Sequence, residues 1–512
     1  MANRPKLARW SMSKHQWLAL VGGLSLLIWG ISGMAHIAMV LFGPQQAEFM
    51  PPMRPLNLSA AQPVETVLGQ AGISSATAVK VVVGEQANLL QVTGKPDQPR
   101  RYFRLDTGAE LPGYDPKQAE YIARHYLKET RPVADIKLQT QFDADYPWVN
   151  RLLPVYRIRF AGDDQLTAFV HTETSGLASV TNVTKLRLQT VFRFLHSWEW
   201  VPQGLDWLRV IVITLMVGSL AALAVTGVMM LVAIRRGKRL PGSRGWHRVM
   251  GYVLALPLLM FSVSGIYHLV QSAMETPGSK LRMSPPVQLT GARYPITRDW
   301  ASVTAGLDVN SLSLVEAPGG RPLYRLGLAQ PGGAMPRGEH DHSAHTGHAM
   351  PKGDTAIRNA RFDGVSPTGP AMYVDAQTGK LWADGDKALA TALGGRFSGA
   401  PASAITDMQL VTRFGPDYDF RNKRLPVWRI DYGAPVNATL FVDTATGVLA
   451  DRTEDWQKPE RFVFSFIHNW NFLFPIGRVG LNIVVGTFVL LLIGFMAGIG
   501  LVLDRRRRAK AR

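Results

Sequence analysis

Four long apolar runs restrict what this chain can fold into. They cover residues 17–42, 207–234, 250–270 and 479–503, and most of their length carries no charged side chain. A helix needs roughly 20 residues to cross a hydrocarbon core about 30 Å thick. Because backbone polar groups in lipid must bond to one another, a continuous helix is the favoured structure for each run. The sequence therefore predicts a membrane-embedded four-helix bundle.

The positive charge of the chain predicts its orientation in the membrane. The formal net charge is +18, and fifteen of those charges lie in three short segments that flank the runs, 4–14, 235–248 and 504–512. Short basic segments beside membrane spans stay in the cytoplasm. We therefore expect both termini and the central loop to be cytoplasmic and two long segments to lie outside. Nucleic-acid binding is disfavoured, because the basic residues gather at the ends of spans rather than on an aromatic-bearing face.

The chain contains an internal duplication. The first and third runs align at an offset of 232 residues, and later motifs align at 272: "LPVYRIRF" (153–160) with "LPVWRIDY" (425–432), and "FRFLHSW" (192–198) with "FSFIHNW" (464–470). Each copy consists of a span, an outside segment and a second span, and the second copy has a net insertion of 40 residues. Since both copies have the same orientation, we expect a pseudo-two-fold axis along the membrane normal.

The outside segments have the pattern of α+β domains. Alternating strands such as 155–160 and 427–432 lead through polar turns into further strands. Short helices are predicted over 115–127 and 385–397, with Asp115 and Asp386 expected to cap them. The predicted organisation has five parts: residues 1–43, an outside domain over 44–200, two spans with a basic loop over 201–275, a second outside domain over 276–475, and residues 476–512.

These motifs resemble a known family. The strand–turn patterns look like PepSY modules, and their position between spans carrying "SGMAH" (32–36) and "SGIYH" (264–268) resembles the PepSY-associated transmembrane-helix family over nearly the whole chain. The resemblance implies two PepSY-like domains beside the bundle. Some members are di-haem inner-membrane reductases that release iron from ferric siderophores. Others are fused to a cytoplasmic flavin reductase domain, for which the cytoplasmic parts of this chain are expected to be too short.

Six of the twelve histidines lie in or beside the spans: His15, His36, His196, His247, His268 and His468. A histidine inside a bilayer is costly and is usually kept to bind or titrate something. Neutral imidazoles on facing helices can occupy both axial positions of haem b. We therefore predict two haem b groups, with His36 and His268 as the first choice of ligands and His196 and His468 as the second. The lack of cysteine excludes covalent c-type haem attachment and disulfides.

The sequence leaves the axial pairing open. Haem on the symmetry axis would pair His15 with His247, or His36 with His268, whereas an off-axis haem would pair an outer histidine of a span with His196 or His468. His15 and His247 lie 21 residues, or about 31 Å of helix, from the outer histidines of their spans, and interfacial anchoring is an alternative role for them. Packing with interhelical hydrogen bonds is the alternative for all six. Gly30, Ser32 and Gly33 are small enough to let a porphyrin approach the backbone, as are Ser264 and Gly265.

Other polar residues have weaker functional patterns. The insertion contains a Met- and His-rich tract over 332–353, in which His340, His342, His345 and His348 could hold copper, zinc or nickel or belong to a solvated linker. His125 and His171 are expected at the surface of the outside domains, and Arg157 and Arg429 on solvated strand faces.

The combined expectation is an inner-membrane haem b oxidoreductase that passes electrons across the bilayer. By resemblance its acceptor is the ferric iron of a siderophore complex, and its donor is quinol or a separate cytoplasmic reductase. Reduction of cupric or another metal ion is an alternative that the Met- and His-rich tract suggests. A non-catalytic PepSY scaffold that binds or inhibits a peptidase is another. A metal permease is disfavoured because the spans contain almost no carboxylate.

Overall fold

The computed structural model describes residues 4–233, 242–274, 282–283, 287–288, 304, 309–328 and 371–511, with gaps at 50, 55, 57, 59, 60, 96, 318, 384 and 416. The chain divides into two units. Met1–Gly43, Val183–Thr276 and Gln457–Arg512 form the helical unit, and Pro44–Asn182 and Pro277–Trp456 form the sheet unit. The Met- and His-rich tract 332–353, with His340, His342, His345 and His348, lies outside the described residues.

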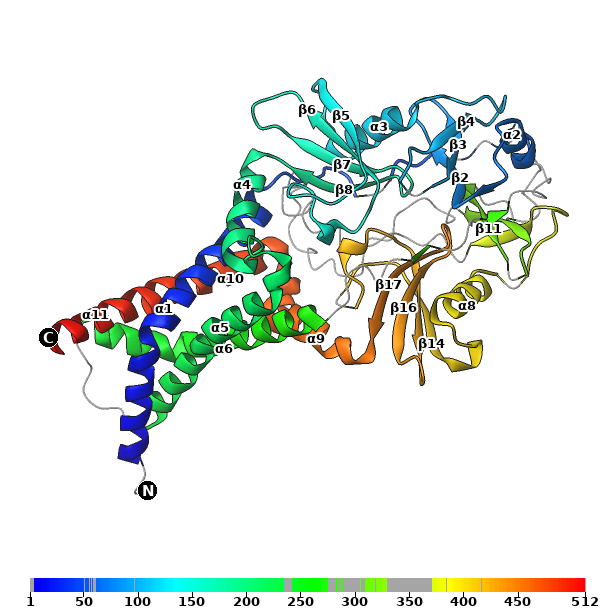
Figure 1. Cartoon of the computed structure of the whole chain (residues 1–512). Coiled ribbons are helices and arrows are strands. Elements are labelled where there is room, and N and C mark those ends of the chain that lie inside the picture. The colour runs from blue at the N-terminus through cyan, green and yellow to red at the C-terminus, as the bar shows by residue number, and fades with distance from the viewer. Residues whose placement is uncertain are drawn as a thin grey trace, which may run out of the picture. The chain divides into compact units, whose positions relative to one another are not determined.

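Four helical segments of the helical unit are long and apolar enough to cross a membrane, at Lys6–Phe42, Gln203–Ala233, Ser243–Met274 and Asn471–Ala509. They contain α1 (Arg4–Phe42), α5 (Asp206–Ala233) and α6 (Ser243–Met274), while the last consists of α10 (Gly477–Leu491), the π-helix η9 (Leu492–Gly498) and α11 (Ile499–Ala511). Helix α1 packs against α5 and α10, and α5 packs against α6 (Figure 1). Their shared core includes Leu26, Leu220, Leu254 and Leu492. The chain is therefore a membrane protein, as the apolar runs predict.

Two shorter arms complete the helical unit. In the first copy, α4 (Val183–Phe192) continues into the π-helix η2 (Arg193–Ser197) and then η3 (Gln203–Leu205). In the second, α9 (Lys458–Phe462) continues into the π-helix η7 (Val463–His468) and then η8 (Asn471–Ile476). The sequence analysis grouped residues 183–200 and 457–475 with the outside segments, but they belong with the membrane helices.

Both halves of the chain contribute to one central sheet of the sheet unit. Its order is β13-β12-β11-β2-β3-β4, and β2 pairs with β11 in antiparallel register, with Lys80 opposite Ser313. The strands are β2 (Ala78–Val83), β3 (Asn88–Thr93), β4 (Arg101–Arg104), β11 (Val309–Glu316), β12 (Pro322–Leu328) and β13 (Met372–Asp375). The two outside segments therefore form one unit rather than the two separate domains expected. Pairing β2 with β11 removes the open edge that each half-sheet would otherwise expose.

Each half also has a flanking antiparallel sheet with one helix packed on it. The first has the order β5-β6-β7-β8 and packs against α3, and the second has the order β14-β15-β16-β17-β9 and packs against α8. Their elements are α3 (Asp115–Leu127), β5 (Val133–Gln139), β6 (Val155–Phe160), β7 (Thr167–His171), β8 (Gly176–Thr181), β9 (Arg282–Met283), α8 (Gly385–Ser398), β14 (Ile405–Val411), β15 (Val427–Tyr432), β16 (Ala438–Asp443) and β17 (Val448–Glu454). Smaller elements are α2 (Val64–Gln70), β1 (Ser75–Ala76), β10 (Val287–Gln288), η1 (Trp148–Asn150), η4 (Ala402–Ala404), η5 (Phe420–Asn422) and η6 (Asp455–Gln457).

The two aspartates expected to cap α3 and α8 have a different role. Tyr114 is the N-cap of α3, and Asp115 instead accepts hydrogen bonds from the backbone N–H of Arg100 at 2.8 Å and the hydroxyl of Tyr102 at 2.7 Å. Asp386 accepts from Nε1 of Trp428 at 2.6 Å. Both carboxylates therefore fasten a helix to neighbouring strands, because a buried carboxylate is stable only with donors around it.

Candidate functional site

The helical unit gathers four histidines near the outer ends of its spans. His36 is on α1, His268 on α6, and His196 and His468 are on the π-helices η2 and η7. His196 and His468 each lie within electrostatic range of the other histidines of this group. Single π-helical turns occur frequently at functional sites. The structure therefore brings together the first-choice pair, His36 and His268, and the second-choice pair, His196 and His468, of the sequence analysis.

Two of these rings are oriented by serines of the neighbouring spans. Nδ1 of His196 lies 2.9 Å from Oγ of Ser32, and Nδ1 of His468 lies 3.0 Å from Oγ of Ser264. Each serine hydroxyl donates its own proton to a backbone carbonyl one turn earlier in its helix. The serine oxygens must then accept Nδ1–H from the imidazoles, which leaves Nε2 of both rings unprotonated. An unprotonated Nε2 is the form that binds a metal.

The inner histidines have the same arrangement with backbone acceptors. Nδ1 of His15 lies 3.1 Å from the carbonyl of Leu223, and Nδ1 of His247 lies 3.0 Å from the carbonyl of Phe495. A carbonyl can only accept, so both rings carry their proton on Nδ1 and have a lone pair on Nε2. The two rings are neighbours in an edge-on arrangement, with centroids 6.2 Å apart and planes at 69°. This mutual contact differs from separate anchoring at a membrane surface.

The outer histidines of the two spans differ from each other. Nδ1 of His268 lies 2.5 Å from Oε1 of Glu460 on α9, and the side chain of Glu460 is 10% exposed. His36 has no hydrogen bond to its ring among the described residues, and it lies within electrostatic range of Lys185 and Arg478. The repeat offset of 272 places Leu188 at the position of Glu460. The sequence reasoning missed Glu460 because this carboxylate has no counterpart in the first half.

Aromatic rings from the repeated motifs pack against the outer histidines. Phe192 stacks on His196 with centroids 4.6 Å apart and Phe464 stacks on His468 at 5.1 Å. The same two rings also contact His36 at 5.3 Å and His268 at 4.0 Å, respectively. These residues are the first letters of "FRFLHSW" and "FSFIHNW", so the duplication itself carried the signal.

A second aromatic layer lies on the inner side of these rings. Trp198 stacks on Trp29 with centroids 5.9 Å apart, and Trp470 stacks on Phe261 at 5.3 Å. Trp198 and Trp470 have φ of 54° and 55°, a left-handed conformation that bulky side chains rarely adopt. Both halves have a tryptophan at this strained position, directly after η2 in the first half and two residues after η7 in the second.

The glycines of the bundle divide into two groups. A Cβ on Gly30 would lie 2.7 Å from Ile493, so this glycine permits close helix packing rather than the porphyrin approach expected from the sequence. A Cβ on Gly33 would meet no atom within 4 Å, and one on Gly265 would lie 3.6 Å from Cε1 of His468. Gly227 is next to the ring of His15 in the same way, at 3.6 Å. Gly265 and Gly227 therefore lie beside histidine rings, whereas Gly33 borders open space.

The arrangement fits haem better than a bare metal ion. Two imidazoles on opposite sides of one iron have ring centroids roughly 6 Å apart, because each metal–nitrogen bond is about 2 Å long. The His15–His247 distance of 6.2 Å agrees with this geometry. None of the six histidines is fully buried by protein. In the described part of the chain, no three His, Asp or Glu side chains gather to hold a metal ion, whereas a porphyrin itself supplies the remaining ligands.

One protein family matches most of the chain. The family model of the PepSY-associated TM region matches residues 12–394. The chain belongs to this PepSY-associated family. No curated protein matches it. Five of the six histidines of this PepSY-associated protein lie within the matched residues, and the internal repeat relates the sixth, His468, to His196.

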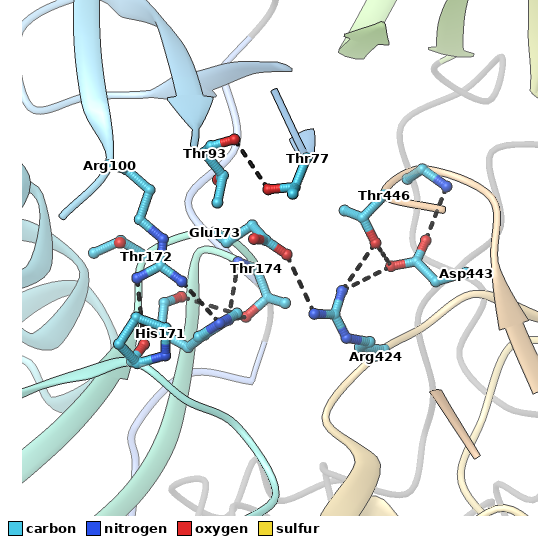
Figure 2. Close-up of polar contacts among 12 residues, drawn as sticks. Thr77, Thr93, Arg100, His171, Thr172, Glu173, Thr174, Arg424, Asp443 and Thr446 are labelled. Atoms are coloured by element: carbon cyan, nitrogen blue, oxygen red, sulfur yellow. Dashed lines mark hydrogen bonds and ion pairs between the residues drawn. The ribbon is translucent and has the colours of Figure 1, made fainter. Parts of the chain in front are cut away.

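The sheet unit of this PepSY-associated protein contains a buried charged network instead of the expected surface histidine. His171 is 2% exposed, and its Nε2 lies 3.0 Å from a terminal nitrogen of Arg100 (Figure 2). Burial, and then the charge of Arg100, lower the pKa of His171 well below its usual value. Its repeat partner Asp443 belongs to the same region, where it accepts from Arg424 at 3.0 Å.

Arg424 links the two halves of this network. It is 6% exposed and lies 3.2 Å from the carboxylate of Glu173, which comes from the first half (Figure 2). Burial alone would raise the pKa of Glu173, but Arg424 and Arg100 hold it below its usual value. Thr446 donates to Asp443 and also contacts Arg424. The network therefore fastens the turn after β7 to the second half of the chain.

The remaining candidates of the sheet unit have local partners. Arg157 pairs with Asp145 at 2.6 Å, and Arg429 pairs with Asp431 at 3.0 Å. Both arginines lie on the repeated strands β6 and β15, and each pairs with an aspartate close to it in the sequence. His125 contacts the ring of Tyr126 and is partly exposed.

Proposed function

We propose that this protein binds haem b in its helical unit and passes electrons across the membrane to a ferric siderophore. The observation that carries the proposal is the common orientation of five histidines. In His15, His196, His247, His268 and His468, Nδ1 is hydrogen-bonded and Nε2 is left for a ligand. A histidine that ligates metal almost always donates its other ring N–H to such a partner. Packing alone would not require the same tautomer five times.

The ligand assignment follows from these anchors. His15 and His247 would hold one haem between α1 and α6, and the outer group would hold the second. Within the outer group, the anchored rings of His196, His468 and His268 are better ligand candidates than His36, which reverses part of the ranking from the sequence. Ser32 lies one helical turn inward of His36, so His196 is about 6 Å nearer to the inner pair. That shift shortens the separation of about 31 Å between the histidines of one span.

The residues of the chain would prepare the site in two ways. The serine and carbonyl acceptors hold each Nδ1 proton and stop the imidazoles from rotating, while Phe192 and Phe464 cover the outer rings. Haem supplies one-electron redox chemistry when it is bound. Reduction of ferric to ferrous iron weakens its binding to hard oxygen ligands, which would release it from a siderophore. The electrons would come from quinol or a separate cytoplasmic reductase.

The proposed setting is a bacterial inner membrane with both termini in the cytoplasm. The basic residues beside the spans support this orientation, which would place the sheet unit in the periplasm, where a ferric siderophore arrives. Reporter fusions at each terminus and within the sheet unit test it. A periplasmic terminus would contradict the orientation.

A visible spectrum of the purified protein tests the cofactor. We expect a Soret band and, after dithionite reduction, split α and β bands. Their absence from protein made in haem-replete cells would overturn the proposal and favour a haem-free PepSY scaffold. Oxidation of the reduced protein by ferric siderophores and by cupric ions, compared side by side, separates the two reductase activities.

Histidine variants test the ligands. His15→Ala and His247→Ala should each remove the same haem equivalent, and His268→Ala and His468→Ala should remove only the other. His125→Ala is the matched control, because this histidine lies on α3 of the sheet unit and should leave both haems in place. Full haem content in the His15 and His247 variants would contradict the inner assignment.

A further inference from the structure

The strongest asymmetry in the helical unit is the partner of His268. Its Nδ1 donates to the Glu460 carboxylate at 2.5 Å, whereas the anchors of His196, His468 and His15 are neutral hydroxyl or carbonyl oxygens. Glu460 is 10% exposed, so its carboxylate is largely withdrawn from water. A largely buried carboxylate attracts a donated proton strongly because little solvent competes for it.

The first half of the chain has the opposite electrostatics. The residue equivalent to Glu460 is Leu188, which offers His36 no acceptor. Two cations, Lys185 and Arg478, lie within electrostatic range of His36 instead. The duplication has therefore produced one outer histidine beside an anion and one beside cations.

The charge of a histidine's partner changes what the histidine does to a bound metal. An anionic acceptor pulls Nδ1–H toward itself, so the ring gains imidazolate character and becomes a more basic ligand. A more basic ligand stabilises ferric over ferrous iron and lowers the reduction potential. Nearby cations favour the less positive ferrous state and act in the other direction.

We propose that Glu460 is a positioning residue that lowers the reduction potential of the outer haem through His268. This inference rests on the proposed function. One electron passes to one ferric ion of the substrate, which becomes ferrous, while the donor iron becomes ferric and is reduced again by an electron from the cytoplasmic side. A lower potential at the outer end increases the driving force of this step, because hard oxygen ligands make ferric iron difficult to reduce.

Glu460→Gln tests the proposal by redox potentiometry of the full-length protein. Glutamine keeps the size and one oxygen acceptor of Glu460 but removes the charge. We expect unchanged haem content and a tenfold shift of one haem's reduction equilibrium toward the ferrous state, which for one electron equals 59 mV, with the other haem unchanged. Glu199→Gln is the matched control, since Glu199 pairs with Arg193 at 2.5 Å in the same unit. Identical potentials in the parent and Glu460→Gln would overturn the inference.

The outcomes separate this inference from the proposed function. A parent protein without haem refutes the function, whereas haem-loaded parent and variant with equal potentials refute only the role of Glu460. If Glu460→Gln fails to fold, the electron paramagnetic resonance spectrum of the oxidised parent gives the answer. We expect two distinct low-spin ferric signals, one of them with the g-value spread of an imidazolate-like ligand. Two signals that both match neutral bis-imidazole haem would contradict the proposal.

Discussion

Arg424→Met should destabilise the sheet unit measurably. The Arg424 guanidinium is 6% exposed and lies 3.2 Å from Glu173 and 3.0 Å from Asp443. Methionine would fill much of its volume but leave two buried carboxylates without the cation that is hydrogen-bonded to both. Removing one partner of a buried ion pair costs about 3–5 kcal/mol, since the remaining charge is uncompensated.

The size of the sheet unit determines how far Tm falls for this loss of unfolding free energy. Unfolding entropy is about 2.1 cal/mol/K for each residue near 60 °C, or roughly 0.6 kcal/mol/K for a unit of roughly 300 residues. The expected fall in Tm is therefore roughly 5–8 °C. Intrinsic fluorescence during heating of the full-length protein in detergent measures it.

A matched variant and a second substitution make the test specific. Arg452→Met removes the same side chain from a more exposed pair with Glu454, and should change Tm by little. Adding Glu173→Gln to Arg424→Met should recover part of the loss, because one stranded charge is removed. Equal melting temperatures for Arg424→Met and Arg452→Met would refute the claim that this network stabilises the unit.

Three further outcomes are expected. His171 has a pKa well below its usual value, so as pH falls below about 6.5 only the unfolded form of the protein gains a proton at this residue. The free energy of unfolding should therefore fall between pH 7.5 and 5.5, and His171→Gln should make Tm less dependent on pH over this range. Ser264→Ala removes the acceptor for Nδ1 of His468 and should lower the affinity for the outer haem about 10–100-fold in a haem titration. The affinity for the inner haem serves as the internal control, and an unchanged affinity for the outer haem would contradict the role of Ser264. Deleting residues 336–349 should leave the haem spectrum intact, and loss of either haem would give the Met- and His-rich tract a role in cofactor binding.

The sequence predicted the parts of the fold that periodicity and repetition encode. Apolar runs gave the four spans, and repeated motifs gave the six histidines and the two flanking sheets. The pairing of β2 with β11 was missed, because either half alone could have formed a complete small domain by local rules. Edge pairing between distant strands depends on which edges remain open after each half has folded.

The details of the candidate site were harder to predict, for a chemical reason. The acceptors of His15 and His247 are backbone carbonyls, so the side chains of Leu223 and Phe495 give no sign of their role. Ser32 and Ser264 were noticed as small residues rather than as acceptors. Glu460 has no equivalent carboxylate in the first half of the chain, and a prediction based on repeated motifs gives little weight to such a residue.

The shared six-stranded sheet has a consequence for how such a chain could arise. A protein with only one copy of the repeat would end its half-sheet at the strand equivalent to β2 or β11, and a second identical subunit could complete it across the same two-fold axis. An ancestral homodimer of this kind must carry identical residues at both outer sites. Fusion into one polypeptide removes that constraint. It allows the second half to have Glu460 at the position where the first half has Leu188.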